Sequence, residues 1–471
     1  MAPVPWVRSK AAPLQGLGDH TSCGRITPFE DENEHELLTA NRQPLTVHSG
    51  LAYFRRLPEE SSEMSIVVQK YGGSSVADAG KLRLVADRIM RTKMEGHDVV
   101  VVVSAMGDTT DDLLALAKQI SSNPDRRELD MLLSAGERIS MALLSMAIRE
   151  LGGDAISFTG SQSGIITNDR HIDARIIEVR PFRVQDELAR GKIVVVAGYQ
   201  GVSYRKEITT LGRGGSDTTA VAMAAALGAE WCEICSDVDG VYSADPRVVP
   251  AAKRIGILSY EETQELAESG ARVLNAQAVE FAKEKGIAIY ARATAGAIPG
   301  NDPSLDGTIV RKLAPRLPGS VIGVTSEKEV LLIQSRNVAG LLKVMDDFGC
   351  PGKQLHISAT GRGQDGLTLV ISKENLHQSS KLQAHLTQQD ADALWNDAIG
   401  AVSIIGAGIN ASHDKVRRGS QALEQAKIRS HGLATSSFRV TWLVDREKVE
   451  QAVRLLHGLF IEAKEPAVPL E

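Results

Sequence analysis

The sequence predicts a three-layer α/β domain with a mostly parallel sheet, followed by two smaller α+β units. Between residues 65 and 294, short strands rich in Val and Ile alternate with helical stretches. The strands are apolar along almost their whole length, which is typical of strands buried on both faces of a sheet. Regular alternation of this kind favours a parallel sheet with helices covering both of its faces.

Strands and helices can be assigned in order along this first domain. The strands are expected at Ile66–Lys70, Asp98–Ser104, Ala155–Thr159, Ile193–Gly198, Glu233–Ser236 and Ile287–Ala291. Two helices are indicated by apolar residues at helical spacing, namely Leu82, Val85, Ala86, Ile89 and Met90, and then Leu132, Leu133, Ile139, Leu143 and Leu144. The Ala-rich segment Asp217–Leu227, which follows a pair of glycines, indicates another helix.

After Thr294 the composition changes. Residues 295–318 hold Gly, Pro, Asp and Asn, as is typical of a connection. Two units with an approximate βαββαβ order follow, and they have the pattern of a degenerate repeat of one small regulatory fold. The first is expected to contain strands Val321–Ser326 and Val330–Ser335, helix Val338–Phe348, strands Gln354–Ala359 and Leu367–Ser372, and helix Ser379–Gln388. The second is expected to contain strand Val402–Ile405, helix Val416–Lys427, strands within Leu433–Val444, and helix Val449–Leu456.

These patterns divide the chain into five parts. Residues 1–63 mix Pro, Gly, His and charges without periodicity, so we expect a disordered extension there. Its acidic residues are unlike an organelle transit peptide, and Met64 is the expected translational start. The boundaries that follow are 64–300 for the α/β domain, 301–319 for a linker, and 320–395 and 396–465 for the two smaller units.

Composition and charge disfavour several classes of protein. The 471 residues carry a net charge of −6 and no long Lys/Arg run, unlike a nucleic-acid binder. The longest apolar runs, such as Val99–Val103, are far shorter than the ~18 residues of a membrane span, so a cytoplasmic enzyme is expected. Cysteines are too few for a disulfide framework: Cys23, Cys232, Cys235 and Cys350. Cys232 and Cys235 lie three apart on a strand and point to opposite faces, which disfavours a metal site.

A glycine-rich segment at the end of the first strand is the first candidate for phosphate binding. It runs from Lys70 to Val76 and contains Gly72 and Gly73. Ligands collect at the carboxyl edge of open α/β sheets, glycines let N–H groups approach phosphate oxygens, and a lysine can stabilise a phosphoryl group in transfer. An ordinary strand–helix turn with a solvated lysine fits the segment equally well. No Walker motif occurs, and the glycines at 361, 363 and 366 indicate a turn between two strands.

The second candidate segment, Gly212–Ala220, leads directly into the Ala-rich helix. A helix N-terminus offers free N–H donors and a favourable dipole to an anion. Arg213 could bind a carboxylate with two hydrogen bonds, and Ser216 or Asp217 could cap the helix. A well-capped helix without a ligand is the alternative interpretation.

Three further segments contain polar residues near predicted strand ends or helices. Ser104–Asp111 follows the second strand, and Ser236–Arg247 follows the fifth and could grip a nucleotide. Ser134–Ser140 lies within a helix, where Glu137 either faces an ammonium group or forms a salt bridge at the surface.

Taken together, the five segments resemble the motifs of the aspartate kinases of the amino acid kinase family, in the family's order. The resemblance extends over residues 65–294 and includes Thr159–Gln162 and Ala197–Gly201. The C-terminal units resemble the paired ACT domains of this family, most clearly at Ile404–Gly408. The resemblance implies transfer of a phosphoryl group from ATP to L-aspartate, which gives 4-phospho-L-aspartate and opens the route to lysine, threonine and methionine.

The resemblance also implies roles for individual residues. Lys70 would stabilise the transferred phosphoryl group and Asp217 would orient Lys70, while Thr110, Glu137 and Arg213 would hold aspartate. The other residues expected around the substrate are Gly214, Gly215 and Ser216. The residues expected around ATP are Lys70, Tyr71, Gly72, Gly73, Ser104, Ser216, Ser236, Asp237, Tyr242, Asp245, Arg247 and Arg272. Mg²⁺ would be carried mainly by the ATP phosphates, without a metal site in the protein.

The chain departs from the family's pattern at several positions. Arg272 and Ser74 stand where the family usually has Lys and Thr. The segment Gln334–Gly340 lacks the Asp and Pro-Gly of the family's effector loop, so inhibition by lysine or threonine is not implied for this chain. A homo-oligomer formed through the ACT-like units is implied. Two alternatives are another amino-acid carboxylate kinase of the same fold and a non-catalytic amino-acid sensor.

Overall fold

The computed structural model describes residues 65–463, except 213, 272–273, 297–305, 351, 359–365, 374–375 and 377–378. The predictions made for residues 1–63, Met64, Arg213 and Arg272 therefore lie outside the described residues.

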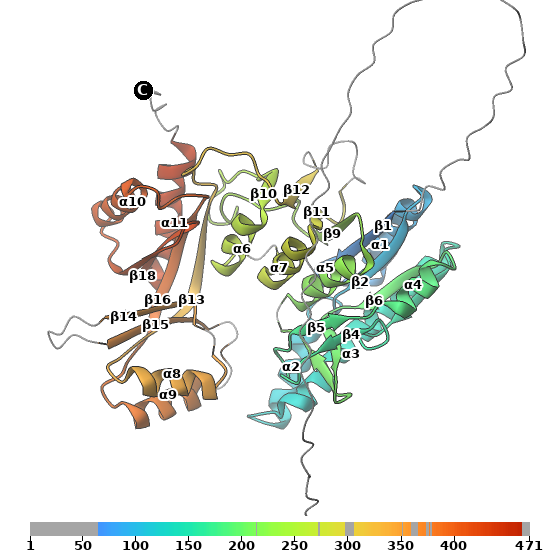
Figure 1. Ribbon diagram of the computed structural model, residues 1–471, viewed down its shortest axis with the longest axis horizontal. Coiled ribbons are helices and arrows are strands. Elements are labelled where there is room, and N and C mark those ends of the chain that lie inside the picture. Colours follow the sequence, from blue (N-terminus) through green and yellow to red (C-terminus); the bar gives the residue numbers. More distant parts are fainter. Residues whose placement is uncertain are drawn as a thin grey trace, which may run out of the picture. The chain divides into compact units, whose positions relative to one another are not determined.

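The first domain is built on an eight-stranded sheet with the order β10-β12-β11-β9-β1-β2-β6-β3 (Figure 1). The strands are β1 (Ile66–Tyr71), β2 (Asp98–Val103), β3 (Ala155–Phe158), β6 (Ile193–Ala197), β9 (Trp231–Ser236), β10 (Ile257–Ser259), β11 (Ala288–Ala293) and β12 (Gly307–Arg311). From β11 to β3 all neighbours are parallel, while β12 runs antiparallel to β11 and β10 runs parallel to β12. The mostly parallel sheet is thus confirmed, and each of the six predicted strands is present to within two residues at either end.

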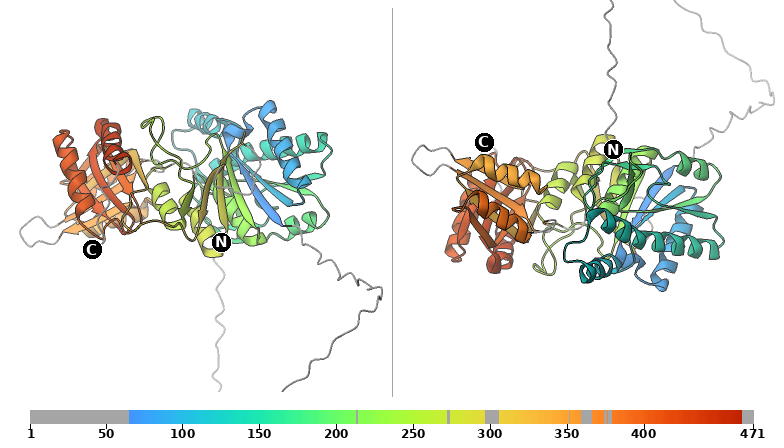
Figure 2. Two further views of the ribbon diagram at one scale, coloured as in Figure 1. Left: turned by 90° about the horizontal axis from the view of Figure 1, so that it is seen from above. Right: turned by 90° about the horizontal axis from the view of Figure 1, so that it is seen from below.

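Helices cover both faces of this sheet, as the alternation predicts (Figure 2). Because successive side chains of a strand point to opposite faces, β2 divides its valines between two cores. Val99, Val101 and Val103 pack with α1 (Ala79–Met94) and α3 (Arg126–Glu150). Val100 and Val102 pack with α5 (Gly215–Leu227) and α7 (Ala276–Lys285). The remaining helices of the domain are α2 (Thr109–Ile120), α4 (Phe182–Leu188) and α6 (Tyr260–Glu268).

Helix α3 buries less of its apolar surface than its sequence predicts. Leu133 and Leu144 are buried, whereas Ile139 is 51% and Leu143 is 38% exposed. A helix buries only one stripe of its surface against a sheet, and the apolar residues of the predicted helix cover a wider part of its surface than that stripe. By length and composition α3 is also the one helix in the described part of the chain that could cross a membrane, but half of the apolar window is buried inside the protein. Burial against a sheet is typical of the core helix of a globular domain.

One feature of the first domain was not predicted and another confirms a detail of the sequence analysis. A second sheet of four strands has the order β5-β4-β7-β8, and its strands are β4 (Ile165–Thr167), β5 (Ile176–Val179), β7 (Gln200–Ser203) and β8 (Ile208–Thr210). These strands are only three or four residues long, so they carry little periodicity. On β9, Cys232 and Cys235 pack into the two different cores, as the strand period predicts.

The C-terminal part forms one continuous six-stranded sheet, with the order β14-β15-β13-β16-β18-β17. The strands are β13 (Gly323–Ser335), β14 (Gln354–Ser358), β15 (Gly366–Ser372), β16 (Leu394–Ile405), β17 (Ser430–Thr435) and β18 (Arg439–Asp445). The helices are α8 (Val338–Asp347), α9 (Ser379–Gln389), α10 (Asp414–Gln425) and α11 (Val449–His457). The two strands predicted at 321–326 and 330–335 are one strand, β13, with an irregular register between Glu327 and Val330.

The two C-terminal units share their long central strands. The second half of β13 pairs with β15, while Gly323–Glu327 pairs with Ala401–Ile405 of β16. The second unit therefore takes its fourth strand from the start of the first unit, and the predicted boundary between 395 and 396 falls inside β16. A strand contributed from so far upstream cannot be assigned from local periodicity, which reports secondary structure but not pairing.

Candidate active site

Lys70 and Asp217 meet at the carboxyl edge of the large sheet. Lys70 lies near the end of β1, between the neighbouring strands β2 and β9, and Asp217 lies in the first turn of α5. The Nζ atom of Lys70 is 2.7 Å from Oδ1 of Asp217, and the two side chains are 12% and 10% exposed. The pair is thus nearly buried yet still reaches solvent, so the lysine is held in one orientation by a carboxylate. The interpretation of Lys70 as a solvated turn lysine is wrong.

The glycine loop, residues 72–75, follows Lys70 and packs tightly against the loop after β2. The N–H of Gly72 donates to the carbonyl of Cys235 at the end of β9, over 3.2 Å. A Cβ atom added at Gly73 would lie 2.9 Å from the carbonyl oxygen of Ala105 and 3.0 Å from that of Gly107. Neither backbone atom can move without shifting its loop, so Gly73 is required for the close approach of the two loops.

Replacing Gly73 by alanine is expected to lower the free energy of unfolding by about 1–3 kcal/mol and to raise KM for ATP, because the added methyl group forces the two loops apart. Chemical denaturation and initial rates measure the two effects. Gly458→Ala is the matched control, since an added Cβ atom meets no atom within 4 Å there. Equal behaviour of the two variants would contradict the role given to Gly73.

Hydroxyl groups join the glycine loop to the loops that follow β9 and β11. The Oγ atom of Ser75 lies 2.6 Å from Oγ1 of Thr294, and Thr294 donates to the carbonyl of Ser236 over 3.0 Å. Three loops at one sheet edge are therefore linked by two hydrogen bonds. Ser75 and Thr294 were missed by sequence reasoning, because a lone hydroxyl in a loop carries no pattern.

Tyr71 does not belong to the site through its side chain. It is fully buried among the residues under α1, and its hydroxyl donates to Oε1 of Gln69 over 3.2 Å. Adjacent residues of a strand point to opposite faces, so the face that brings Lys70 to α5 carries Tyr71 away from it. Contact of Tyr71 with the nucleotide through its backbone stays a prediction.

Glu137 on α3 is buried with one carboxylate oxygen unsatisfied. The residue is 3% exposed, Oε1 accepts a hydrogen bond from the N–H of Ala105 over 3.1 Å, and Oε2 has no hydrogen-bond partner among the described residues. Burial raises the pKa of this carboxyl group from 4.5 to about 7. The interpretation of Glu137 as a surface residue is therefore wrong, and a buried acceptor without a partner is suited to a cationic ligand.

Affinity for a substrate with an ammonium group is expected to depend on the ionisation of Glu137. Only the carboxylate attracts an ammonium group, and it dominates above a pH of about 7. We therefore expect KM for aspartate to rise as the pH falls below about 7, approaching tenfold per pH unit. Initial rates between pH 5.5 and 8.5 measure this dependence, which should vanish in Glu137→Gln. A constant KM over that range would contradict the role of the carboxylate.

Helix α3 connects Glu137 to two further polar groups on the same face. Asp130, Ser134 and Glu137 follow the spacing i, i+4 and i+7, which places them on one side of the helix. The carbonyl of Ser134 accepts from Nε2 of Gln200 over 3.0 Å. Asp130 is fully buried, and burial raises the pKa of its carboxyl group. One buried stripe of α3 thus contacts several loops around the site.

Asp130 holds the segment that precedes the helix α5 turn. Its Oδ1 accepts from the N–H of Ile172 over 3.0 Å and from the hydroxyl of Thr210, and its Oδ2 lies 2.6 Å from Nδ1 of His171. Thr210 ends β8, only two residues before Gly212. Sequence reasoning missed these partners of Asp130 because they lie in the small sheet and its connections, which were not predicted.

The turn that opens α5 is not capped by a side chain. The helix begins at Gly215, and its N-cap is Gly214 with φ of +72° and no side-chain hydrogen bond. Ser216 and Asp217 lie inside the first turn, so the prediction that one of them caps the helix is wrong. A Cβ atom at Gly214 would lie 2.5 Å from Nδ2 of Asn275, so its positive φ and its crowding both require glycine. An uncapped N-terminus is suited to an anion.

The remaining predicted residues lie around these loops. Ser104 follows β2, and its N–H donates to the carbonyl of Tyr71 over 3.1 Å. Thr110 lies half-buried in the first turn of α2. Ser236 ends β9 and hydrogen-bonds through its hydroxyl to the backbone of Val238.

The loop between β9 and β10 carries the other nucleotide candidates. Tyr242 donates to Oδ1 of Asp239 over 2.8 Å, and Asp239 also forms an ion pair with Arg254. Asp245 and Arg247 form an ion pair with each other over 2.8 Å, with Arg247 largely exposed. Asp237 starts the loop directly after Ser236. Contact of these residues with a nucleotide stays a prediction.

A buried charged cluster lies beneath the loops and was not predicted. Glu233 of β9 is flanked by Arg88 of α1 at 3.8 Å and by Arg292 of β11 at 3.6 Å, and Gln69 donates to it over 2.9 Å. Burial lowers the pKa of Arg292. Two guanidinium groups and one carboxylate leave this part of the sheet positively charged, which favours an anion at the edge above it. The signal in the sequence was a charged residue inside an apolar strand.

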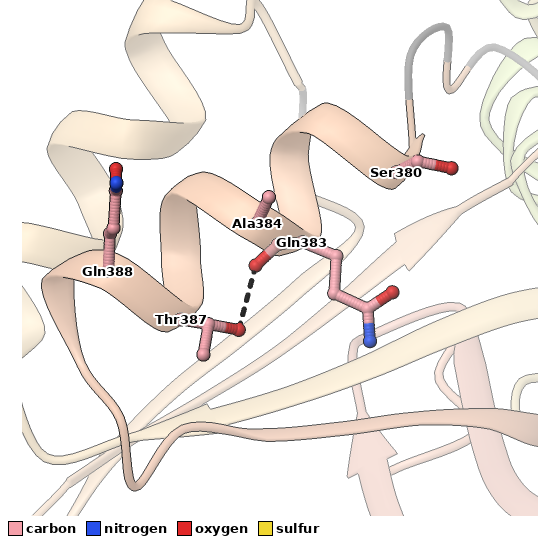
Figure 3. A pocket seen from close by; sticks show the side chains of 5 residues that line it. All are labelled: Ser380, Gln383, Ala384, Thr387 and Gln388. Atoms are coloured by element: carbon pink, nitrogen blue, oxygen red, sulfur yellow. Dashed lines mark hydrogen bonds between the residues drawn. The ribbon is translucent and has the colours of Figure 1, made fainter.

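A shallow hollow on the C-terminal sheet's helix α9 is unrelated to these residues (Figure 3). Its volume is about 470 Å³ and its lining is formed by Ser380, Gln383, Ala384, Thr387 and Gln388. All five come from one helix, and Thr387 donates back to the carbonyl of Gln383 over 2.9 Å. The hollow contains no charged side chain, so we assign no chemistry to it.

Comparisons with known proteins agree with this geometry. Residues 65–291 match the amino acid kinase family. An aspartokinase from Mycolicibacterium smegmatis is 45% identical over 412 residues, which covers 84% of this chain and 96% of the relative. An aspartokinase from Thermus thermophilus is 37% identical over 413 residues, covering 84% of this chain and 99% of the relative.

Solved structures show the same fold. Aspartokinase III of E. coli in complex with aspartate and ADP matches with a TM-score of 0.72 and 24% identity, over 83% of this chain and 99% of that one. The same enzyme in complex with lysine and aspartate matches with a TM-score of 0.63 and 25% identity, over 84% of this chain and 99% of that one. The fold, the identities and their coverage lead to one conclusion: the chain belongs to the aspartokinase family of kinases.

Proposed function

We propose that this enzyme transfers the terminal phosphoryl group of ATP to the side-chain carboxylate of L-aspartate, forming ADP and 4-phospho-L-aspartate. The observation that carries the proposal is the ion pair between Lys70 and Asp217 at the uncapped start of α5. It combines a positioned positive charge with the positive end of the α5 helix dipole, and both stabilise phosphate oxygens. The solved E. coli relative, which holds aspartate and ADP, supports the same pair of ligands.

The reaction requires the protein mainly to position the two substrates and to stabilise charge. A carboxylate is already ionised at neutral pH and is itself the nucleophile, so no strong general base is required. Catalysis then depends on alignment of the two substrates and on stabilisation of charge in the transition state. We assign charge stabilisation to Lys70, orientation of Lys70 to Asp217, and close contact with phosphate to Gly72 and Gly73.

In this proposal the enzyme recognises both the α-ammonium group and the α-carboxylate of the substrate amino acid. The unsatisfied Oε2 of Glu137 would accept from the α-ammonium group. Arg213, with Gly214, Gly215 and Ser216 beside it, would bind the α-carboxylate, and Thr110 would contact the substrate from α2. These assignments leave the side-chain carboxylate free to attack the phosphoryl group.

ATP would lie along the edge formed by the glycine loop and the loop after β9. Ser104, Ser216, Ser236, Asp237, Tyr242, Asp245, Arg247 and Arg272 are the residues that we propose to surround it. Among the described residues there is no cluster of three or more His, Cys, Asp or Glu side chains suited to a metal ion. Mg²⁺ would therefore be held mainly by the phosphates, in keeping with its preference for retaining water ligands.

The C-terminal sheet is proposed to be a pair of interlocked ACT-like units that support a homo-oligomer. The enzyme would then act in the cytoplasm at the start of lysine, threonine and methionine biosynthesis. In place of the family's effector loop, β13 ends at Ser335 and Asn337 caps α8 through a bond to the N–H of Gly340 over 3.0 Å. Equilibrium binding of lysine and of threonine, measured beside inhibition, tests whether either effector acts on this chain.

A coupled assay of ADP release tests the proposed reaction. ADP formation should require aspartate, and trapping with hydroxylamine should give the hydroxamate of an acyl phosphate. Glutamate and N-acetylglutamate are the comparison substrates, because a preference for either would support another carboxylate kinase of this fold. Binding of aspartate without ADP release would instead support an amino-acid sensor and would contradict the proposal.

A further inference from the structure

The nucleotide-side loop, residues 237–254, packs into the core of the C-terminal sheet. Ala244 and Val249 are each only 4% exposed and belong to the same hydrophobic cluster as Val449, Val453 and Leu456 of α11. The loop is therefore attached to both domains, since Val241 packs in the core of the first domain and donates its N–H to Oγ1 of Thr308 over 2.8 Å. One end follows Ser236 at the proposed ATP site, and its middle is anchored on the C-terminal sheet and α11.

A chain of hydrogen bonds strengthens this anchor. Ser243 is 3% exposed, and its carbonyl accepts from the N–H of Val324 over 2.7 Å. The Oγ atom of Ser243 lies 2.9 Å from Nε2 of His457, the last residue of α11, which is fully buried. The other ring nitrogen of His457, Nδ1, lies 2.8 Å from Oε1 of Glu462. The loop is thus connected to α11 and to the segment after it.

The partners of Ser243 determine the direction of these bonds. Its Oγ already accepts from the N–H of Lys253 over 3.0 Å. The hydroxyl hydrogen is then directed to Nε2 of His457, so that Nδ1 carries the ring hydrogen and donates to Glu462. Each hydrogen-bond donor in this series thus has an acceptor, and removing one side chain leaves a buried polar atom of its neighbour without a partner.

Beside the hydrogen bonds of Ser243 and His457, the loop and the C-terminal sheet are not closely packed. A cleft of about 460 Å³ separates Ser243, Lys253 and Arg254 of the loop from Phe460 and Ile461. On the side of the C-terminal sheet, the loop is held by the contacts of Ala244 and Val249 and by the hydrogen bonds of Ser243.

We propose that Ser243 and His457 are positioning residues that hold the nucleotide-side loop in its ATP-binding conformation. The C-terminal sheet then determines the affinity for ATP through this bridge. The inference rests on the proposed function, since it takes the loop after β9 to contact the nucleotide. Neither residue touches ATP in this proposal.

Steady-state kinetics of Ser243→Ala and His457→Leu test the bridge. We expect KM for ATP to rise about five- to twentyfold in both variants, with KM for aspartate and kcat changed less than twofold. His457→Gln should keep KM for ATP within threefold of the wild type, because its amide oxygen can accept from Ser243. A merely structural defect would lower kcat or raise both KM values together, and that result would overturn the inference.

Ser436→Ala is the matched control. Ser436 also joins the C-terminal sheet to the first domain, by donating to Oε1 of Glu265 over 3.2 Å, but it does not contact the nucleotide-side loop. KM for ATP should stay unchanged in this variant, and a rise equal to that of Ser243→Ala would overturn the inference. Calorimetric titration with ADP gives an independent readout: a five- to twentyfold weaker Kd in Ser243→Ala supports the bridge, and an unchanged Kd overturns it. If the wild type binds ADP but releases none from ATP with aspartate, the proposed function has failed, while the titration still decides the role of the bridge.

Discussion

Lys70→Ala is expected to lower kcat by about 30- to 1,000-fold, while the enzyme remains folded. Removing one preorganised charge that stabilises a transition state raises the barrier by about 2–4 kcal/mol, and each 1.4 kcal/mol corresponds to a factor of ten. KM for aspartate should change much less, because the lysine is assigned to the phosphoryl group. Single-turnover measurement of ADP formation separates the chemical step from product release.

Stability and a matched control complete this test. Loss of Lys70 leaves Asp217 without its ion-pair partner, so the free energy of unfolding should fall by about 1–3 kcal/mol, which a domain of ordinary stability tolerates. Lys81→Ala is the control, since Lys81 is an exposed lysine that contacts the carbonyl of Ser74 in the glycine loop. Normal turnover by Lys70→Ala would refute the assignment, as would an equal loss in Lys81→Ala.

Glu137→Gln is expected to raise KM for aspartate by about 100-fold. The amide is similar in shape to the carboxyl group and can still accept from the N–H of Ala105, but it lacks the charge that attracts an ammonium group. Truncating one partner of a buried, hydrogen-bonded charge pair typically reduces binding by 2–5 kcal/mol. KM for ATP should stay within threefold of the wild type, and kinetics with each substrate varied in turn measure both constants.

The same variant should be more stable than the wild type at pH 8 but not at pH 5. The pKa of Glu137 is raised from 4.5 to about 7 by burial, so the folded protein binds a proton more tightly than the unfolded chain. Stability from the neutral carboxyl group is therefore present below pH 4.5 and is lost as the pH rises to about 7, by on the order of 3 kcal/mol. Glutamine is never ionised, so the gain appears only where the wild type is ionised.

Thermal unfolding at the two pH values measures this difference. Glu150→Gln is the control, because Glu150 is an exposed residue at the end of the same helix. It should change neither KM nor the dependence of stability on pH. A Glu137→Gln enzyme with normal KM for aspartate, or with equal changes of stability at both pH values, would contradict the presence of an ionised carboxylate in the site.

The sequence predicted best those parts of the site whose backbone conformation is determined by the local residue types. The glycine loop, the turn at Gly214 and the buried face of α3 follow from local residue types, because glycine permits close approach and helical spacing defines a face. The caps predicted at Ser216 and Asp217 were wrong, and the side chain of Tyr71 lies away from the site, in both cases for local reasons. The strand period places Tyr71 on the opposite face from Lys70, and the helix begins earlier than its Ala-rich run.

Other parts depended on contacts between distant segments. Asp130 depends on partners in a small sheet whose strands are too short to show periodicity. The bridge between Ser243 and His457 joins residues 214 positions apart, and neither residue has a sequence signal of its own. The shared strands β13 and β16 likewise follow from pairing between segments, not from the pattern within either one.

The sequence by itself determined the class of the first domain, its six main strands, the motifs at their ends and the family resemblance. All of these depend on periodicity and on residue types that are adjacent along the chain. Tertiary structure decided that Lys70 meets Asp217, that Glu137 is buried with one free oxygen, and that the C-terminal units exchange a strand. These outcomes depend on burial and on pairing across the fold, which become defined only when the whole chain packs.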